Sequence, residues 1–346
     1  MVNKAAVVME NRKIEIMDTP MPEMKPGYVK VKVGYCGVCG SDVHFYSFGE
    51  PDFPDVYPFI IGHEFAGTVV EVADGVKDLK VGDRVCVEPG TFCGKCEWCK
   101  KGKYNLCKEM EFLSAPRTKG AMREYITHPA ELCFKLPDNV STMEGALIEP
   151  LAVGFHAANL GEAHIGQTAV VTGSGCIGLV SLLAMKAMGV SRVYVVGVIE
   201  ARLRKALECG ADGVINGRTA DVVQEVMRLT GGRGTDLVIE TAGTEATTRQ
   251  AIQMAKKGST IVLVGLGASG EMTLPMTAAI NKELTFKSIC RYRHCYPMAI
   301  DAVATGRINI RGIVTNEFAF DDLPEALDIC INNKDEVVKG VVRVAD

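Results

Sequence analysis

The stretch that decides the fold runs from residue 168 to residue 189 and reads TAVVTGSGCIGLVSLLAMKAMG. It begins with an apolar, β-branched segment and continues with apolar residues at helical spacing. Between the two lies Gly173-Ser-Gly175-Cys-Ile-Gly178, a G-x-G-x-x-G pattern at a strand-to-helix junction. Such glycines allow a tight turn and a close backbone approach, so that a pyrophosphate can rest on the helix N-terminus. We therefore expect a dinucleotide site here, with Cys176 and Ile177 in the first turn of the helix beside the cofactor.

The alternation of strand and helix continues on the C-terminal side of this stretch. Short β-branched segments alternate with segments of helical spacing, in the order RVYVV, EARLRKALECG, GVIN, DVVQEVMRLTG, TDLVIETAG and STIVLVGLG. Repeated β-α-β units with apolar strands are typical of a parallel, doubly wound sheet. The sequence therefore predicts an α/β domain of the Rossmann type.

Composition limits the classes of partner. The chain has 346 residues, 47% of them apolar and 23% charged, which suits a soluble protein with two cored domains. A net charge of -4 gives no basic surface for nucleic acid or for an anionic membrane. No apolar run reaches the roughly 18 residues of a membrane span, and no signal-peptide core follows the N-terminus. A cytoplasmic location is expected, where the 13 cysteines favour metal binding over disulfides.

Four of these cysteines lie within fifteen residues, in the segment CGKCEWCKKGKYNLC. The spacing C-x2-C-x2-C-x7-C brings together Cys93, Cys96, Cys99 and Cys107. Four thiolates can close tetrahedrally around one zinc ion and leave no position for a substrate. The segment therefore predicts a structural zinc site, the alternative being four free thiols in an exposed loop.

A second group of candidate ligands lies upstream. YCGVCGSDVHFY contains Cys39, Ser41 and His44, and IIGHEFAGTVVEV contains His63 and Glu64. Cysteine, histidine and glutamate can form a zinc site with an open position, which is the arrangement a catalytic metal needs. Taken alone, a histidine beside a glutamate is also compatible with a surface hydrogen bond.

Together these motifs resemble the zinc-dependent medium-chain alcohol dehydrogenase superfamily over nearly the whole chain, and within it the sorbitol/polyol dehydrogenases. The resemblance rests on CGVCGSDVH, GHEFAGTVVEV with VGDRV, the four-cysteine segment, KLPDNVSTMEGALIEPLAVGFHA and CRYR. The segment ALIEPL is the most specific, because it has Glu149 where alcohol dehydrogenases proper usually have a zinc-binding cysteine and threonine dehydrogenase-like relatives an aspartate. Phe45 departs from the tyrosine that polyol dehydrogenases often have.

The resemblance implies an architecture. A β-rich, chaperonin-10-like (GroES-like) catalytic domain would span residues 1–152, with the structural zinc lobe at about 90–110. A Rossmann cofactor-binding domain would span 153–289, and 290–346 would return to the catalytic domain. Relatives are commonly dimers or tetramers, so we expect a homo-oligomer, and a tetramer, with STIVLVGLG and the following EMTLPM at a pairing sheet edge.

The resemblance also implies a mechanism. Cys39 and His63 would hold the catalytic zinc, Glu64 would follow by family pattern, and Glu149 would either bind the metal or hydrogen-bond a zinc-bound water. An alcohol oxygen would take the open position, and the carbinol hydrogen would leave as hydride to the nicotinamide.

The proton released from the alcohol needs a route out of the site. Ser41 matches the family's relay hydroxyl, and His44 would continue the path. The alternatives are a turn-capping serine and a surface histidine.

Substrate identity rests on CRYR, where Arg291 and Tyr292 would hydrogen-bond polyol hydroxyls. Core packing is the alternative for Tyr292. A competing enzyme is a threonine or 2,3-butanediol dehydrogenase on the same scaffold. A non-enzymatic alternative is a zinc-ribbon binding module fused to a nucleotide-sensing domain, but it assigns no role to Cys39, His63 or Glu149.

Cofactor choice depends on the end of the second strand of the Rossmann domain. An acidic residue about twenty positions after the glycine motif holds the adenosine ribose of NAD. That position falls on Gly197 in RVYVVGVIEARL. We expect NAD to bind with poor discrimination against NADP, with Glu200 as a partial substitute and Arg202 near a 2′-phosphate. Gly197→Asp is accordingly expected to favour NAD. Two residues at the end of STIVLVGLG are also expected to contact the cofactor, Val264 and Leu266.

Overall fold

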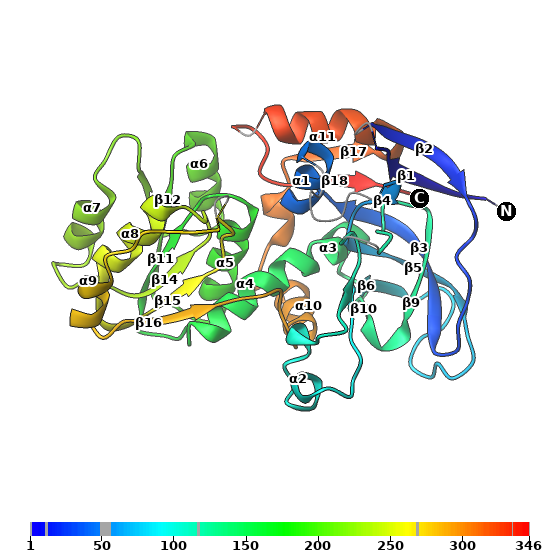
Figure 1. Cartoon of the computed structure of the whole chain (residues 1–346), viewed down its shortest axis with the longest axis horizontal. Coiled ribbons are helices and arrows are strands. Elements are labelled where there is room, and N and C mark those ends of the chain that lie inside the picture. The colour runs from blue at the N-terminus through cyan, green and yellow to red at the C-terminus, as the bar shows by residue number, and fades with distance from the viewer. Residues whose placement is uncertain are drawn as a thin grey trace. The chain divides into compact units, whose positions relative to one another are not determined.

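The computed structural model describes residues 2–10, 13–48, 57–115, 118–267, 270–333 and 335–345. Its internal contacts divide the chain into two compact units, each described separately below. The first comprises Met1–Glu149, Tyr296–Ala304 and Val314–Asp346, and the second Pro150–Cys295 and Thr305–Ile313. Figure 1 shows the course of the chain through both units.

The first unit is built on a sheet in which segments from both ends of the chain pair. The strands follow the order β10-β6-β5-β3-β18-β17, with β9 also paired to β3. The pairs are antiparallel except β17 with β18. The strand bounds are β3 Tyr28–Gly37, β5 Glu64–Val72, β6 Arg84–Val87, β9 Tyr125–Pro129, β10 Cys133–Lys135, β17 Asn316–Ala319 and β18 Gly340–Arg343. Because β18 pairs with β3, the C-terminal segment completes the sheet that carries the N-terminal motifs.

The core of this unit follows the alternation of its strands. In β3 the side chains of Val29, Val31 and Val33 are fully buried, whereas the intervening Lys30 and Lys32 reach the surface. Successive side chains of a strand point to opposite faces, so one face of β3 packs inward. A smaller sheet has the order β2-β1-β4, and a two-stranded ladder joins β7 to β8. Their bounds are β1 Asn3–Val8, β2 Ile14–Thr19, β4 Phe59–Ile60, β7 Gly90–Thr91 and β8 Glu111–Phe112.

Short helices connect the strands of the first unit. Ser141 begins α3 with a capping box, in which its hydroxyl accepts from the backbone of Glu144 and the Glu144 carboxylate accepts in return. The helix bounds are α1 Gly40–Phe48, α2 Glu97–Lys100, α3 Thr142–Ala146, α10 Tyr296–Ala304 and α11 Leu323–Asn332. The 3-10 turns are η2 Tyr104–Leu106, η3 Ala130–Leu132 and η5 Phe320–Asp322. Helix α4, Ile148–Leu160, begins in the first unit and continues in the second.

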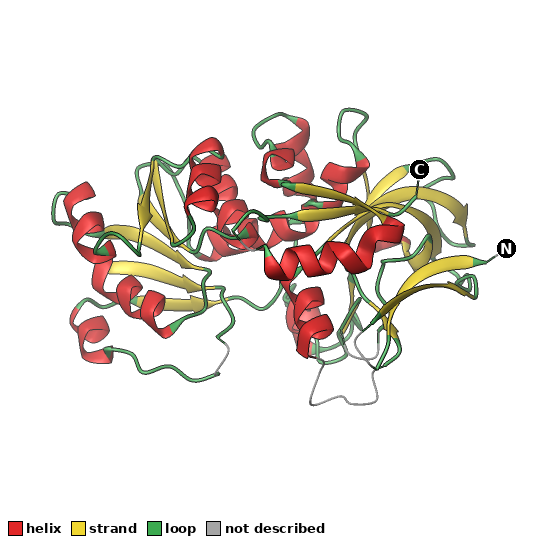
Figure 2. Cartoon of the chain, turned by 90° about the horizontal axis from the view of Figure 1, so that it is seen from above, coloured by secondary structure: helices red, strands yellow, loops and turns green. Residues whose placement is uncertain are grey.

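The second unit is a parallel α/β sheet flanked by helices (Figure 2). Its strand order is β13-β12-β11-β14-β15-β16, and every neighbouring pair is parallel. The strand bounds are β11 Thr168–Thr172, β12 Arg192–Gly197, β13 Gly213–Asn216, β14 Thr235–Glu240, β15 Ala255–Leu263 and β16 Thr285–Ser288. The helices are α5 Cys176–Ala187, α6 Glu200–Glu208, α7 Val222–Leu229, α8 Glu245–Met254 and α9 Met276–Asn281, with the turn η4 at Ile310–Ile313. The α/β prediction for this part of the chain is confirmed.

The prediction that STIVLVGLG and EMTLPM form a sheet edge is wrong. Strand β15, which contains STIVL, lies between β14 and β16, and EMTLP forms neither strand nor helix. The apolar character of β15 reflects burial between neighbours, since strands covered on both faces read as continuous apolar runs. The edge strand on this side is β16. Within the described ranges no helix has the length and apolar character needed to cross a membrane.

Candidate active site

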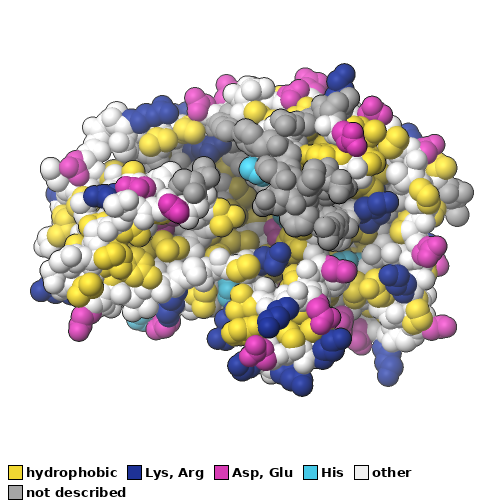
Figure 3. Space-filling view, viewed as in Figure 1, with side chains coloured by type: hydrophobic (Ala, Val, Ile, Leu, Met, Phe, Trp, Pro, Cys, Tyr) yellow, Lys and Arg dark blue, Asp and Glu magenta, His cyan; other side chains and the backbone are white. Residues whose placement is uncertain are grey.

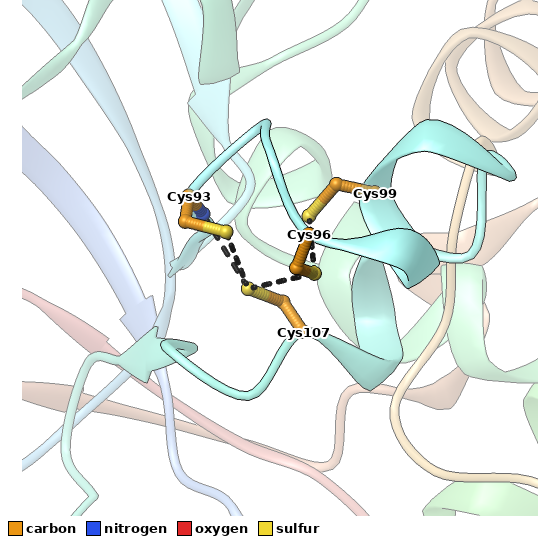
Figure 4. Close-up of side chains that lie close together, drawn as sticks. All are labelled: Cys93, Cys96, Cys99 and Cys107. Atoms are coloured by element: carbon orange, nitrogen blue, oxygen red, sulfur yellow. Dashed lines mark hydrogen bonds between the residues drawn. The ribbon is translucent and has the colours of Figure 1, made fainter.

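The four clustered cysteines meet in one small lobe (Figure 4). The Cys96 sulfur lies 3.5 Å from that of Cys99 and 3.9 Å from that of Cys107, which is 3.5 Å from the Cys93 sulfur. Zinc–sulfur bonds of about 2.3 Å place the sulfurs of a tetrahedral site about 3.8 Å apart. The spacing of the sulfurs therefore fits one zinc ion with no open position.

Local structure holds this lobe in shape. Helix α2 carries Cys99, and the ring of Phe92 stacks on that of Tyr104 with centroids 4.5 Å apart. Hydrogen bonds, the largest from the Cys99 backbone, lower the pKa of Cys96 to about 6, whereas desolvation raises the pKa of the neighbouring Cys99 to about 12. One thiol of this pair is thus prepared as a thiolate, the form that binds metals.

The surface of the lobe carries charges of both signs. In Figure 3 Lys or Arg side chains lie among Asp or Glu side chains around α2. The Lys95 ammonium lies 3.7 Å from the Glu109 carboxylate, and the Lys101 ammonium lies 3.6 Å from the Glu97 carboxylate. Ion pairs of this kind give no one-signed surface for nucleic acid, in line with the composition.

The second group of ligands also comes together. The ligand atoms of Cys39, His63 and Glu64 lie within 4.8 Å of one another. Cys39 lies between β3 and α1, His63 lies between β4 and β5, and Glu64 is the first residue of β5. The pairing of β3 with β5, with Gly37 opposite Glu64, brings these segments side by side.

The surroundings of His63 favour a cation. Burial acts to lower the pKa of the ring, but the charges of Cys39, Asp42 and Glu149 raise it well above its ordinary value. The Nδ1 atom is buried and has no hydrogen-bond partner among the described residues, with Asp42 Oδ1 3.9 Å away. A site that stabilises an imidazolium in this way equally suits a bound metal cation, so the residues fit a zinc ion.

Asp42 is the functional residue that sequence analysis missed. Its fully buried carboxylate accepts hydrogen bonds from the backbone N–H of Cys39 at 2.9 Å and of Gly62 at 3.0 Å. The Ser114 hydroxyl donates to it at 2.9 Å. One acid thus ties together the two segments that carry Cys39 and His63. Its signal in the sequence is an aspartate between the candidate ligand Cys39 and the candidate relay residue His44 in CGSDVH, at the start of a helix.

The carboxylate of Glu64 has a partner of its own. It forms an ion pair with the ammonium of Lys339, and both side chains are only 2% exposed. Lys339 also donates to the carbonyl of Val38 at 2.9 Å. A side chain at Gly37 would overlap the Glu64 carboxylate, since its Cβ would lie 2.1 Å from Oε2. Glu64 is therefore close to the candidate metal but charge-compensated by a lysine, and its role as a ligand stays a prediction.

Glu149 approaches the same site from the first turn of α4. The residue is 5% exposed and lies outside the 4.8 Å ligand group, but its charge raises the pKa of His63. Desolvation, with the Glu149 charge as a further cause, also raises the pKa of the buried Glu88 to about 7. This placement is compatible with either predicted role for Glu149, metal ligand or partner of a bound water.

The glycine motif forms the predicted turn between β11 and α5. Gly173 has a φ of +106°, and a side chain there would meet the Thr241 hydroxyl at 2.5 Å. A Cβ on Gly178 would lie 1.9 Å from the Gly173 carbonyl, so only glycine lets the helix pack this closely on the turn. Gly175 is the N-cap of α5 and has no side-chain cap, which leaves the helix N-terminus open to an anion.

A cavity of about 480 Å³ lies beside this turn within the second unit. Gly173, Gly175, Gly197 and Arg202 are among its lining residues. A Cβ on Gly175 would meet only Arg202 Nη1, at 3.7 Å, so the missing side chain leaves open space at the turn. The cavity and the uncapped helix fit a dinucleotide.

The surroundings of Gly197 bear on the expected roles of residues 197 and 200 in cofactor choice. A Cβ on Gly197 would lie 2.3 Å from the Ser174 hydroxyl oxygen and 2.8 Å from Ser174 Cβ. A side chain at residue 197 therefore requires Ser174 to shift, and the effect of Gly197→Asp on cofactor choice stays a prediction. Glu200, the proposed substitute acid, instead accepts a hydrogen bond from the Asn216 amide at 2.8 Å and does not line the cavity.

Comparison with known proteins places this geometry in a family. Residues 25–138 match the alcohol dehydrogenase GroES-like domain, and residues 176–305 match the zinc-binding dehydrogenase family. An uncharacterized zinc-type alcohol dehydrogenase-like protein of Escherichia coli is 40% identical over 100% of both chains. Sorbitol dehydrogenase of Bacillus subtilis is 37% identical over 98% of this chain and 96% of that one. The crystal structure of 2R,3R-butanediol dehydrogenase from Bacillus subtilis is 36% identical, with a TM-score of 0.90 and 99% of both chains covered.

The chain belongs to the zinc-dependent medium-chain alcohol dehydrogenases. The predicted family and fold class, a GroES-like domain with a Rossmann-like domain, are confirmed. The protein is thus an oxidoreductase of the zinc- and nicotinamide-dependent type, related to the sorbitol dehydrogenases. This excludes the binding-module alternative.

Two predicted relay residues of the dehydrogenase lie on α1. Ser41 is half-buried in the first turn, and no hydrogen bond joins it to another described residue. His44 is exposed, with its ring 6.2 Å from that of Phe45 in an edge-on arrangement. Both follow Cys39 closely in the sequence. Their roles in proton transfer stay predictions.

The remaining predicted residues belong to the second unit of the dehydrogenase. Arg291 is exposed with a φ of +54°, and Tyr292 is 3% exposed. Val264 donates its backbone N–H to the Glu240 carbonyl at 2.8 Å, and Leu266 is 96% exposed. Neither Val264 nor Leu266 lines the cavity beside the glycine turn. The cofactor contacts of these two residues and the substrate contacts of Arg291 and Tyr292 stay predictions.

Proposed function

We propose that this dehydrogenase oxidises a secondary alcohol of a polyol, of the sorbitol, xylitol or L-iditol type, to the corresponding ketose. The observation that carries the proposal is the group of half-buried Cys39 with buried His63 and Glu64, organised by Asp42, in a chain that also has an open cavity beside the glycine turn. The alcohol loses two hydrogens, one as a hydride to the oxidised nicotinamide and one as a proton to water. The products are the ketose, the reduced dinucleotide and the proton.

Different residues of the chain would bind the metal, orient its ligands and transfer the proton. When bound, zinc supplies a Lewis acid that makes an alcohol more acidic, and the dinucleotide supplies the hydride acceptor. Cys39 and His63 would hold the metal, and Asp42 would orient both through its hydrogen bonds. Ser41 would relay the alcohol proton, accepting it while it passes its own hydroxyl proton toward His44 and solvent.

The polyol substrate class is supported by sequence similarity to a sorbitol dehydrogenase and by two polar residues. The sorbitol dehydrogenase of Bacillus subtilis is 37% identical, and Arg291 with Tyr292 would supply donors for polyol hydroxyls. A polar pocket of this kind disfavours simple alcohols, which leave its donors unpaired. A second candidate is 2,3-butanediol, favoured by the butanediol dehydrogenase with a TM-score of 0.90.

A turnover screen tests the proposal. Sorbitol, xylitol, L-iditol, galactitol and L-arabitol are compared with 2,3-butanediol and threonine, each with NAD and with NADP. We expect the highest kcat/KM with a polyol. A higher kcat/KM with butanediol or threonine would refute the polyol assignment while leaving the dehydrogenase intact.

Variants of the two substrate residues sharpen the screen. Arg291→Met and Tyr292→Phe should each lower kcat/KM for the preferred polyol by about tenfold, because each removes a hydrogen bond. Oxidation of 2-butanol, which offers no second hydroxyl, should change far less. Arg311→Met, a change of a basic residue in the turn η4, serves as the control.

Assembly and location belong to the same proposal. We expect a homo-oligomer, and a tetramer, as the family resemblance implies; β16 is an edge strand of the sheet of the second unit, and Ile280 on α9, which precedes β16 in the chain, is exposed. A cytoplasmic location stays an expectation, and cysteines grouped for metal binding are compatible with it.

A further inference from the structure

A buried carboxylate lies at the end of a strand that borders the cavity beside the glycine turn. Glu240 is the last residue of β14, is 1% exposed and forms no ion pair with a described residue. A buried charge without a countercharge is stable only when hydrogen-bond donors surround it. Glu240 is not among the residues that line the cavity, so an effect on binding has to pass through its neighbours.

Five hydrogen bonds surround this carboxylate. Its Oε1 accepts from the backbone N–H groups of Ala242 at 3.0 Å and Gly243 at 3.1 Å. The same oxygen accepts from the hydroxyls of Thr172 at 3.2 Å and Thr247 at 2.9 Å. Oε2 accepts from the Gly243 N–H at 3.1 Å. Every partner is a donor, which is the set that an ionised carboxylate accepts.

The donors come from three segments around the cavity. Thr172 ends β11 directly before the glycine turn, Ala242 and Gly243 lie in the loop after β14, and Thr247 lies in the first turn of α8. Ala242 and Thr247 also line the cavity. One carboxylate therefore ties the loop and the helix that line the cavity to the strand that leads into the glycine turn.

The neighbouring residue, Thr241, packs against the glycine turn itself. Its hydroxyl donates to the Thr172 carbonyl at 2.7 Å, and its backbone N–H donates to the same carbonyl at 2.8 Å. A Cβ on Gly173 would lie 2.5 Å from this hydroxyl, so the turn and Thr241 are in close contact. A shift of the loop after β14 would therefore disturb the turn at the N-terminus of α5.

The N-terminus of α8 is a second place at the cavity where an anion could bind. Its N-cap Thr244 accepts from the Thr247 N–H at 3.2 Å, and the Glu240 carboxylate accepts from the Thr247 hydroxyl in the same turn. Helix α5 has no side-chain cap. Anions favour a helix N-terminus, and a neighbouring negative charge repels them. This difference between the two helices directs a pyrophosphate to α5.

We propose that Glu240 is a positioning residue for the dinucleotide. It does not touch the cofactor, but holds the loop after β14 and the glycine turn at the spacing that the cofactor needs. Its charge also leaves the N-terminus of α5 as the position of the pyrophosphate. The inference rests on the nicotinamide dependence of the family and not on the identity of the alcohol.

Glu240→Gln tests the role of the carboxylate. The amide keeps the shape and one acceptor oxygen, but places an N–H donor against the N–H of Gly243. Calorimetric titration of the zinc-loaded enzyme uses adenosine diphosphoribose, which carries the pyrophosphate but no nicotinamide. The Kd should rise by about tenfold, because the loop and the turn lose their common anchor. A Kd equal to that of the wild type would overturn the proposal.

Thr235→Val is the matched control. Thr235 lies at the opposite end of β14, is fully buried and donates its hydroxyl to the carbonyls of Thr168 at 2.8 Å and Leu237 at 2.9 Å. Both variants remove a buried hydrogen bond of the same strand and should lower the melting temperature. The Kd should change in Glu240→Gln alone. An equal rise in Kd for Thr235→Val would assign the effect to lost stability and refute the positioning role.

Steady-state kinetics separate positioning from catalysis. With the polyol that has the highest kcat/KM, Glu240→Gln should raise the KM for the dinucleotide by about tenfold and leave kcat within about twofold of the wild type. Such a split indicates lost binding that is common to the ground state and the transition state. A lowered kcat with an unchanged KM for the dinucleotide would contradict the proposal.

The outcomes separate this proposal from the proposed function. If Glu240→Gln does not fold, Thr172→Val decides, since it keeps the side-chain shape and removes one donor. Its Kd should rise by about two- to fivefold, and an unchanged Kd would refute the proposal. A wild type that binds adenosine diphosphoribose but oxidises no polyol refutes the polyol assignment alone. A wild type that does not bind this fragment overturns the positioning role of Glu240.

Discussion

Lys339 forms a buried ion pair with Glu64, the residue next to the candidate ligand His63, and each side chain is 2% exposed. The lysine precedes β18, whose pairing with β3 carries it to the Cys39 segment. The C-terminal segment therefore supplies a charge to the candidate active site. Replacing one partner of a buried pair leaves the other charge uncompensated.

Lys339→Met should destabilise the protein by about 3–5 kcal/mol, because the Glu64 carboxylate stays buried without its partner. The double variant Glu64→Gln with Lys339→Met should recover most of this loss. Denaturant unfolding measures both. Lys95→Met is the control, since Lys95 and Glu109 are 75% and 62% exposed in their ion pair and its loss should cost at most about 1 kcal/mol. Equal losses at the two lysines would contradict the argument.

Zinc analysis of Glu64→Gln distinguishes the two roles of Glu64. If the carboxylate only pairs with Lys339, the variant keeps two zinc ions per chain. A loss of one zinc ion would make Glu64 a ligand, as the family pattern predicts.

The two cysteine groups should respond differently to substitution. Cys39→Ser should abolish turnover and leave the melting temperature within a few degrees, because its zinc site serves chemistry. Cys96→Ser should lower the melting temperature or the solubility, because its zinc closes a lobe whose helix α2 buries no residue. Metal analysis should find one zinc ion lost in each variant. A Cys39→Ser variant with a tenth of wild-type activity would exclude the catalytic assignment.

Stability should fall on acidification through His128. Burial, the largest cause, lowers the pKa of this histidine to about 4, and its Nε2 lies 2.9 Å from the Glu88 carbonyl. The unfolded chain, with a pKa of about 6.5, binds the proton first as the pH falls, so the contribution is complete above pH 6.5 and lost toward pH 4. Between pH 7.5 and pH 5 the loss should be about 2 kcal/mol of unfolding free energy.

His128→Gln should flatten this pH dependence, because the amide does not titrate but can still donate to the Glu88 carbonyl. His164→Gln, at an exposed histidine, should leave the wild-type profile unchanged. Thermal unfolding across pH 5–7.5 provides the comparison. Parallel profiles for the wild type and His128→Gln would show that another group causes the acid sensitivity.

The expected oligomer should depend on the β16 side of the second unit. Ile280 on α9 is 71% exposed, and charge there should weaken association if this side is an interface. Light scattering should therefore show a smaller mass for Ile280→Asp than for the wild type. Ile165→Asp is the matched control, because Ile165 is 79% exposed in a loop outside the helices and strands. A wild-type monomer at micromolar concentration would rule out the oligomer.

Features that depend on near neighbours were predictable from the sequence alone. The turn at Gly173, Gly175 and Gly178 was predictable because strand and helix periodicities reveal a junction where only glycine fits. The four-cysteine lobe was predictable because its ligands lie within fifteen residues, so their spacing nearly defines the geometry. Cys39 and His63 were recognised through motifs rather than through geometry, since 24 positions separate them.

Relationships between distant segments were decided only by the tertiary structure. Asp42 reads as an ordinary helix-start acid, and its three hydrogen bonds exist because the Gly62 and Ser114 segments pack against it. The side chain of Ser174 occupies the space that a side chain at residue 197 would need, because β11 and β12 lie side by side. No local sequence pattern indicates this contact. Periodicity reflects the backbone geometry of consecutive residues, whereas steric fit and charge pairing arise only when the folded sheets bring separate strands and turns into contact.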